Sequence, residues 1–351
     1  MTLLEETINS IGALDSAAQA EARTRLDSLT KPPGSLGVLE EIVVKLAGIT
    51  GEKCPVVREK VVIVMAGDHG VVNQGVSAYP QEVTPQMVLN FLNGGAAINV
   101  LSRHAEARVV VCDIGVIGEI DAPGLVVKKV RHGTADMTEG PAMTRQEAVR
   151  AVEVGIELAQ AEIASGAQIL GTGDMGIGNT TPSSAILAAF SGAPLKNLVG
   201  RGTGLDDGRL EEKRKVIEKA LEVNRPDPDD ALDVLAKVGG LEIGAIAGTV
   251  LGAASRRVPV VIDGFIAGAG ALLAARLCPQ VTEFMLASHL SEEPGHALIL
   301  ELLDLEPMLT LKMRLGEGTG AALAFHIIDA ATRIQVEMAT FQEAGVSEKD
   351  I

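Results

Sequence analysis

The sequence predicts an α/β fold in which a parallel β-sheet carries helices on both of its faces. Three observations support this fold class. Short runs rich in β-branched residues alternate with amphipathic stretches, the runs end in turns that bear polar groups, and the two ends of the chain lack such runs. Strands of a parallel sheet are buried on both faces, so they appear as continuous apolar runs. We therefore expect a doubly wound sheet with a smaller helical part beside it.

Five runs are the expected strands: VVIVMAGDH from Val61, RVVVCDIG from Arg108, AQILGTGD from Ala167, VPVVIDG from Val258 and TEFMLASH from Thr282. Apolar residues at helical spacing predict a helix over residues 145–164. The stretch NRPDPDD, residues 224–230, predicts a helix break because it contains two prolines among acidic and amide residues. Functional groups of a doubly wound sheet gather where the strands' carboxyl ends open, so we expect the site at that edge.

The two ends of the chain read as helices without matching strands. Chain termini often lie close together in space, so these helices can pack on one another. We therefore expect a large α/β domain over residues 26–304 and a small helical domain formed by residues 1–25 and 305–351.

Composition and charge exclude several classes of function. The 351-residue chain has a net charge of −16, and nucleic-acid binding needs clustered Lys and Arg instead. The first residues are acidic, unlike a signal segment, and the longest apolar stretches are too short to span a bilayer. Neither the three cysteines nor the six histidines show metal-type spacing. We expect a cytoplasmic protein that binds no nucleic acid, no membrane, no metal ion and no cofactor.

The most informative segment is LGTGDMGIGNTTPSS, residues 170–184. It follows an expected strand and opens an expected helix, with Thr180 or Thr181 as the cap and Pro182 at the first helical position. Its glycines let a ligand approach backbone N–H groups, and the helix N-terminus favours an anion. We expect a site for one phosphate here, and a tight turn without a ligand is the alternative.

Two generic motifs overlap in this segment, and each lacks a second feature. GTGDMG matches G-x-G-x-x-G, but no acid occurs between Asp174 and Asp206, where a dinucleotide site has its ribose-binding acid. GDMGIGN has P-loop spacing, but Asn179 stands where a lysine would reach the outer phosphates. An NAD-dependent oxidoreductase and a non-catalytic nucleotide-binding module remain the alternative functions.

Other candidate residues lie in five stretches. Residues 199–215, VGRGTGLDDGRLEEKRK, bring Lys213, which can supply the positive charge missing from the first loop, although a solvated charged helix is the alternative. His69 can be a metal ligand or a base, but a hydrogen-bonded structural histidine is favoured. Asp113 and Asp263 close two other strands, and a functional group and a helix cap are equally plausible roles for them. Glu317 lies between glycines in RLGEGTGAALAFH, just before an apolar helical run. It can cap that helix, or act as a general base as a lone acid in apolar surroundings.

Eight segments occur in this order along the chain: LTKPPGSLG, MAGDHGV, GVSAYPQEVT, GTGDMGIGNTTPSSAI, GRGTGLDD, VIDGFIAGAGALLA, FMLASHLSEEPGH and MRLGEGTGAAL. Together they closely resemble the nicotinate-nucleotide–dimethylbenzimidazole phosphoribosyltransferases of cobalamin synthesis, over nearly the whole chain. The resemblance implies a Rossmann-like parallel sheet of six strands, a small helical domain from both chain ends, and a homodimer.

The resemblance also implies an activity and a set of site residues. The enzyme would move the 5-phosphoribosyl group from nicotinate mononucleotide to 5,6-dimethylbenzimidazole, giving α-ribazole 5′-phosphate and nicotinate, with Glu317 as catalytic base. The residues expected at the nucleotide are Gly173, Asp174, Gly176, Gly178, Asn179, Thr180, Gly202 and Lys213. Those expected at the benzimidazole are Tyr79, Gln86 and Leu315. Some family members carry Glu where this chain has Asp174, and the shorter acid reaches less far.

Overall fold

The computed structural model describes residues 1–202 and 204–347. Its strands are β1 (Lys60–Gly67), β2 (Ala107–Gly115), β3 (Leu125–Val127), β4 (Ile169–Met175), β5 (Val260–Ile262) and β6 (Met285–Ala287). Its helices are α1 (Leu3–Ser10), α2 (Ser16–Asp27), α3 (Val38–Thr50), α4 (Val83–Leu92), α5 (Ala97–His104), α6 (Arg145–Ala164), α7 (Thr180–Ser191), α8 (Leu195–Leu198), α9 (Asp207–Asn224), α10 (Ala231–Val238), α11 (Leu241–Ala254), α12 (Phe265–Leu277), α13 (His296–Leu303), α14 (Thr319–Glu337) and α15 (Phe341–Ala344), with 3₁₀ helices η1 (Gly70–Gln74) and η2 (Pro279–Phe284).

The six strands form one parallel sheet in the order β3-β2-β1-β4-β5-β6. This is the strand order of the Rossmann fold, so the predicted Rossmann-like sheet is confirmed. All five strands expected from their apolar runs are present. β3 was not expected from its own residues, because it is only three residues long and partly exposed. The order of the strands reverses at β1, because β2 and β3 lie on one side of it and β4, β5 and β6 lie on the other, and a crevice opens at such a switch point.

Helices cover both faces of the sheet, as predicted. Alternate residues of β1 point into two different cores, because side chains of a strand alternate between its faces. Val61, Ile63 and Met65 belong to a core shared with α6, α7, α10, α11 and α12. Val62 and Val64 belong to a second core shared with α3, α4, α5 and α14.

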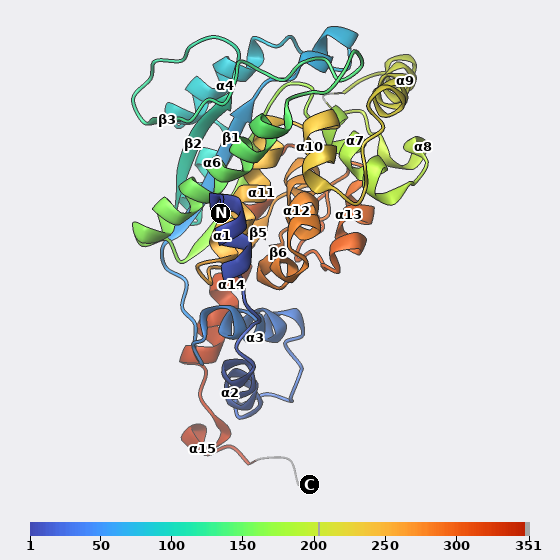
Figure 1. The fold of residues 1–351 in the computed structure, drawn as a ribbon. Coiled ribbons are helices and arrows are strands. Elements are labelled where there is room, and N and C mark those ends of the chain that lie inside the picture. The colour runs from blue at the N-terminus through green and yellow to red at the C-terminus, as the bar shows by residue number, and fades with distance from the viewer. Residues whose placement is uncertain (203, 348–351) are drawn as a thin grey trace.

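The helices at the lower end of Figure 1 join the two ends of the chain. α2 and α3 pack on each other, α3 packs on α14, and Arg25 donates to the Gln335 and Met338 carbonyl oxygens at 3.3 and 3.1 Å. Two contacts differ from the expected division at residues 25 and 305. α1 packs on α6 and α11 beside the sheet, whereas α3 joins the terminal helices. The domain boundaries themselves stay a prediction.

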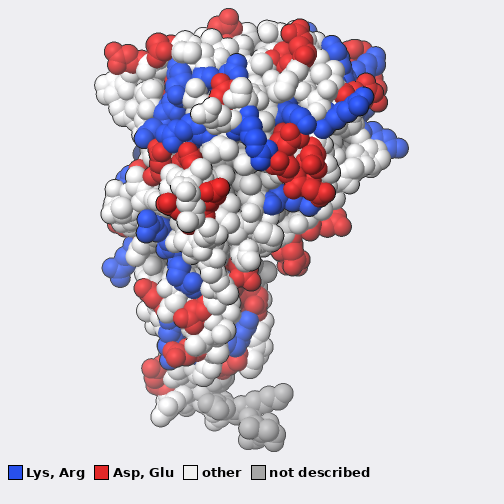
Figure 2. Space-filling view, viewed as in Figure 1, with Lys and Arg blue, Asp and Glu red and all other residues white. Residues whose placement is uncertain are grey.

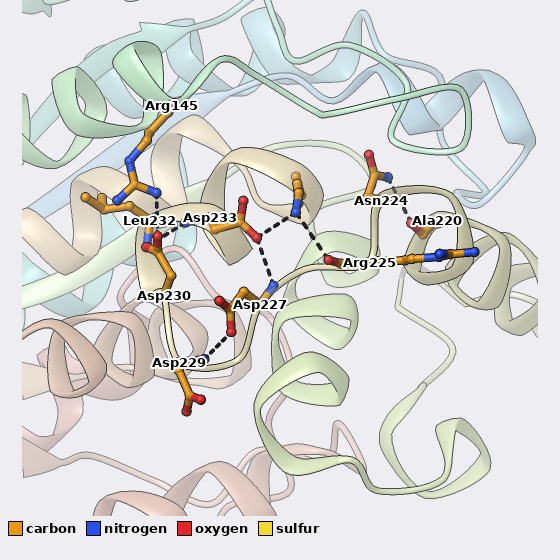
Figure 3. A network of polar contacts seen from close by, with 10 residues as sticks. Arg145, Ala220, Asn224, Arg225, Asp227, Asp229, Asp230, Leu232 and Asp233 are labelled. Carbon is orange, nitrogen blue, oxygen red and sulfur yellow. Dashed lines mark hydrogen bonds and ion pairs between the residues drawn. The ribbon is translucent and has the colours of Figure 1, made fainter.

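The predicted break at residues 224–230 separates α9 from α10 (Figure 3). Arg225 ends α9 in the left-handed region at φ 45°. Asp230 then caps α10 by accepting from the backbone N–H groups of Leu232 and Asp233, and it also pairs with Arg145 of α6 at 2.7 Å. The ion pair between Asp230 and Arg145 therefore connects the segment between α9 and α10 to α6, which covers one face of the sheet.

The surface carries intermixed charges. In Figure 2, Lys and Arg side chains lie beside Asp and Glu side chains over much of the face that is shown. On α6, for example, Arg150 pairs with Glu157, and Lys128 reaches the same glutamate at 3.2 Å. Within residues 1–202 and 204–347, no helix is long and apolar enough to cross a membrane.

The closest packing in the fold joins α6 and α11 across two glycines. A Cβ atom added at Gly248 would lie 1.8 Å from the Val152 carbonyl oxygen, and one at Gly155 would lie 1.9 Å from that of Ala245. We predict that Gly248→Ala destabilises the protein by about 1–3 kcal/mol through overpacking, although alanine is the better helix former by about 1 kcal/mol. Urea unfolding measures the difference.

Gly208→Ala is the matched control. Gly208 is also helical, but its added Cβ would meet nothing closer than an Asp206 side-chain oxygen at 3.4 Å. We expect this variant to be as stable as the parent or slightly more stable. A Gly248→Ala protein that gains stability would contradict the close packing of the two helices.

Candidate active site

A cavity of about 560 Å³ opens at the carboxyl ends of the strands, where the sequence predicted the site. Nine of the twelve predicted site residues line it: Tyr79, Asp174, Gly176, Gly178, Asn179, Thr180, Gly202, Leu315 and Glu317. Gln86, Gly173 and Lys213 are not among the lining residues. A second cavity, of about 590 Å³, lies at the opposite end of β1 around Lys60 and Asp329, away from these groups.

Glu317 lies in an unusual backbone segment at the wall of the cavity. Gly316, Glu317 and Gly318 all have positive φ angles, of 80°, 64° and 92°. The Glu317 side chain is buried, and its Oε2 has no hydrogen-bond partner within the described part of the chain. Burial raises the pKa of this carboxyl, while the N–H of Ile98, in the first turn of α5, lowers it. A buried carboxylate with a free oxygen can accept a proton from a ligand in the cavity.

Asp263, which follows β5, holds the start of α14 beside Glu317. Its Oδ2 accepts a hydrogen bond from the Gly318 N–H at 3.1 Å, and its Oδ1 accepts from the N–H groups of Gly320 and Ala321 at 2.6 and 3.2 Å. Asp263 is buried, and this burial raises its pKa to about 7 although the three N–H groups oppose the rise. Of the two roles that the sequence left open for Asp263, the structure shows the helix cap, but the helix is α14 and not the next one in the chain.

This finding decides one role of Glu317 that the sequence left open. The N-cap residue of α14 is Gly318, and the free N–H groups of the first turn are bonded to Asp263. Glu317 makes no side-chain hydrogen bond to its own helix within the described residues. The carboxylate of Glu317 is thus not needed to cap α14 and is available to a ligand.

The glycines of β4 serve packing more than ligand approach. A Cβ atom on Gly173 would lie 2.6 Å from the Glu317 carbonyl oxygen, and one on Gly171 would lie 3.0 Å from Ala321. A Cβ atom on Gly176 would lie 2.3 Å from the Gly67 carbonyl oxygen of β1. Protein atoms therefore fill the space that the sequence interpretation left for a phosphate. Gly176 still lines the cavity, whereas Gly173 supports the Glu317 segment from behind.

The start of α7 differs from its predicted form. The helix begins at Thr180 after Asn179, so Pro182 is its third residue and not its first. Asn179 forms no side-chain bond to the helix and instead donates to the Asp174 carboxylate at 2.9 Å. Burial, followed by the charges of Asp263 and Glu242, raises the pKa of Asp174 well above its usual value.

His69 and Glu242 form a buried pair, and neither side chain is among those that line the cavity. His69 Nε2 lies 2.8 Å from Glu242 Oε1, and both side chains are fully buried. Although burial lowers the pKa of His69, the charges of Glu242 and Asp68 leave it raised. This arrangement agrees with the structural role expected for His69.

Lys213 brings a positive charge to the Thr180 side of the cavity. Its ammonium group donates to Thr180 Oγ1 at 2.6 Å and to the Gly200 carbonyl oxygen at 3.4 Å. Lys213 is only 1% exposed, and burial lowers its pKa to about 8 although the Glu293 charge opposes this shift. A solvated role for this lysine is therefore wrong, while the neighbouring Lys215 does lie on an exposed face.

Four polar residues that line the cavity were not expected from the sequence: His289, Ser291, Glu293 and Arg314. Three of them follow β6 in SHLSEEPGH, and the fourth precedes Glu317. Arg314 donates to the Gly202 carbonyl oxygen at 2.6 Å. Their position just after a strand that ends at the cavity was the available signal.

The opposite side of the cavity is more apolar. Val76, Val83, Met87 and Leu315 line it together with Tyr79. The side chains of Tyr79 and Leu315 remain more than half exposed. Gln86 lies on the exposed side of α4, so the structure does not bring it to the cavity wall.

Comparison with known proteins gives consistent matches. A family model described as "Phosphoribosyltransferase" matches residues 11–346. The chain is 59% identical over 349 residues to the nicotinate-nucleotide–dimethylbenzimidazole phosphoribosyltransferase of Desulforamulus reducens, covering 99% of each chain. It is 56% identical to that of Geobacter sulfurreducens over the full length of both. A crystal structure of the enzyme of this name from Thermus thermophilus is 51% identical, with a TM-score of 0.91 over 96% of this chain and 100% of that chain.

The Asp263 contacts yield a prediction about stability. In Asp263→Asn the amide NH₂ replaces one carboxylate oxygen, so it faces a backbone N–H that has lost its acceptor. A buried donor left without a partner costs about 1–3 kcal/mol. We predict a loss of this size at pH 8, measured by urea unfolding. The same change at the exposed cap Asp15, which accepts from Ala17 and Ala18, should have almost no effect because Asn caps equally well. Equal stability of the Asp263→Asn and parent proteins would contradict the capping role.

Proposed function

The chain belongs to this phosphoribosyltransferase family, and on that premise we propose that its cavity joins nicotinate mononucleotide and 5,6-dimethylbenzimidazole. The phosphoribosyl group moves to the benzimidazole, and the products are α-ribazole 5′-phosphate and nicotinate. One observation carries the assignment of the site. A buried carboxylate with a free oxygen, that of Glu317, lies at the same cavity as the helix start at Thr180 with its lysine.

The nucleotide phosphate binds at the Thr180 end of the cavity. α7 begins there, and the positive end of its dipole favours an anion at this corner, although the N–H groups of Thr181 and Ser183 in its first turn are bonded to backbone carbonyl oxygens. The Lys213 ammonium group, which donates to Thr180, adds a positive charge at this end of the cavity. Gly202 lines the same end. This combination suits a single phosphate, because a helix terminus with one lysine gives few donors for a longer polyphosphate chain.

The benzimidazole binds on the apolar side, between Leu315 and the segment that carries Tyr79. Val83 and Met87 of α4 give this side a hydrophobic surface for a flat ring. Glu317 follows Leu315 by two positions, so a ring that contacts Leu315 can direct one N–H toward the carboxylate. Such a slot recognises the shape of the base rather than many polar groups.

The reaction requires one proton acceptor. The bond between C1′ and the pyridinium nitrogen breaks, and its electron pair returns to nicotinate, which leaves as a neutral ring nitrogen. A benzimidazole nitrogen attacks C1′ from the opposite face, which inverts the β-linked nucleotide to the α-linked product. The other ring nitrogen becomes acidic and gives its proton to Glu317. The remaining contribution of the protein is to position the two partners.

A dinucleotide-dependent oxidoreductase is poorly supported by the same residues. The sequence lacks the ribose-binding acid beyond Asp174. In addition, the first glycine of the G-x-G-x-x-G match packs against Ala321 of α14 instead of facing a crevice. A non-catalytic nucleotide-binding module would need no free carboxylate at Glu317.

We predict that Glu317→Gln lowers turnover by roughly 10²- to 10⁴-fold, the usual range for loss of a general base. Glutamine is nearly isosteric but cannot accept a proton at neutral pH. Chromatography of nicotinate and α-ribazole 5′-phosphate measures the rate, and the melting temperature of the same preparation checks the fold. Glu306→Gln, which removes an exposed acid of the preceding loop, should leave the rate unchanged.

The pH dependence separates a base from a structural residue. Because burial raises the pKa of Glu317, the carboxyl takes up a proton as pH falls through that raised value, and the parent rate should fall with it. The Glu317→Gln protein should lose this acidic limb. A folded variant with the parent rate and the parent profile would refute the base assignment, and Asp174 would then be the next carboxylate to test.

We further propose that the chain forms a homodimer and acts in the cytoplasm, where a charged nucleotide is available. Large apolar side chains exposed on α4, α5 and β3 support an interface between copies: Leu89, Val100 and Val127 are 42%, 54% and 53% exposed. We predict a particle of twice the 36.4 kDa chain mass in light scattering at micromolar concentration. A monomer under these conditions would rule out the dimer.

A further inference from the structure

Glu293 is a buried carboxylate at the phosphate end of the cavity, and the reaction scheme gives it no role. It lies in the loop between β6 and α13 and is 5% exposed. Its N–H donates to Ser291 Oγ at 3.3 Å, and the side chain lines the cavity. Its Oε2 has no hydrogen-bond partner within the described part of the chain. A buried carboxylate with an unbonded oxygen is costly unless charges compensate it.

The compensating charges converge on residues 200–202. A Cβ atom on Gly200 would lie 2.0 Å from Glu293 Oε2, so only glycine allows the carboxylate to approach this loop. The carbonyl oxygens of the same loop accept from both cations, since Lys213 donates to Gly200 and Arg314 donates to Gly202. Glu293 therefore occupies a corner that two positive side chains approach from α9 and from the segment before α14.

This corner is the one at which the nucleotide phosphate binds in the proposed function. The single charge of Glu293 partly balances the two cations when the site holds no phosphate. A phosphate monoester brings close to two negative charges at neutral pH. Those two charges match Lys213 and Arg314, which leaves the Glu293 charge in excess and next to another anion.

We propose that Glu293 is the resident counter-anion of the phosphate subsite and takes up a proton when a phosphate monoester binds. The inference rests on the proposed function for the position of the phosphate. Glu293 then limits the affinity for nucleotides, because binding must displace or neutralise its charge. The same competition assists release of the phosphorylated product.

The other titratable groups near Glu293 do not fit this role. His296 Nδ1 accepts from the Ser291 N–H at 2.9 Å, and burial lowers its pKa to about 3, so it stays neutral. Burial also lowers the pKa of His289. Asp174 has a pKa that is already raised well above its usual value. Lys213, with a pKa of about 8, already carries most of its proton at pH 7.

The remaining acid is Glu293 itself, apart from Glu317 at the other end of the cavity. Burial raises the pKa of Glu293, while Lys213, Arg314 and the Gly202 N–H lower it. A phosphate that engages those three groups removes the opposing effect. The pKa of Glu293 then rises further, which is the physical origin of the proton uptake.

Calorimetry tests the proposal with the whole protein and nicotinate mononucleotide at pH 7, in two buffers of different ionisation enthalpy. The parent protein should take up a fraction of a proton from the buffer on binding. Glu293→Gln should lose this uptake and bind roughly tenfold more tightly, because by linkage a coupling of one pKa unit corresponds to a tenfold change in affinity. Ionisation of the ligand contributes equally to both proteins. Glu292→Gln, a change at the exposed neighbouring acid, should match the parent.

Several outcomes separate this inference from the proposed function. Unchanged proton uptake and unchanged affinity in Glu293→Gln would overturn the inference alone. A parent protein that binds inorganic phosphate with proton uptake but does not bind nicotinate mononucleotide would overturn the proposed function and leave the role of Glu293 standing. If Glu293→Gln does not fold, the proton uptake of the parent at pH 7 decides the matter, because Lys213 already carries most of its proton at that pH. A parent that takes up no proton on binding nicotinate mononucleotide would refute the proposal.

Discussion

The carboxylate of Asp263 is the contact on which the rest of the site depends. It extends from the end of β5 to three N–H groups at the start of α14, although 55 residues of chain separate Asp263 from Gly318. These bonds anchor the segment in which Gly316, Glu317 and Gly318 all adopt left-handed backbone angles. A left-handed conformation costs a residue with a side chain about 1–2 kcal/mol. The anchoring compensates for this strain and keeps the Glu317 carboxylate at the cavity wall.

Close packing against the backbone of β4 also holds the Glu317 segment in place. Gly173 lets the Glu317 backbone lie directly on β4, and Gly171 does the same for the first turn of α14. The glycine pattern that resembles a dinucleotide fingerprint therefore mainly allows the start of α14 to pack closely against β4. The phosphate side of the cavity depends instead on the start of α7 and on side chains from α9 and from the loops around Gly202 and Glu293.

The sequence predicted most of what depends on local pattern. Apolar runs identified five strands, helical spacing gave the bounds of α6, and the break at residues 224–230 was found where α9 ends. The sequence could not predict which partner a buried polar side chain binds, because that partner comes from a distant part of the chain. A cap was one of two possible roles for Asp263, and its helix could not be named. Lys213 looked like part of a charged surface although it is buried. Glu292 and Glu293 are identical neighbours in sequence, and only tertiary packing exposes one and buries the other.

The central claim is that a buried, rigidly held Glu317 carboxylate faces the base that receives the phosphoribosyl group. A crystal structure of the protein with 5,6-dimethylbenzimidazole bound tests it most directly. We expect one ring nitrogen to lie about 2.6–3.2 Å from a Glu317 carboxylate oxygen, with the ring against Leu315 and the Asp263 contacts intact. A ring bound in the cavity with neither nitrogen near Glu317, while that carboxylate remains at the N–H of Ile98, would contradict the claim.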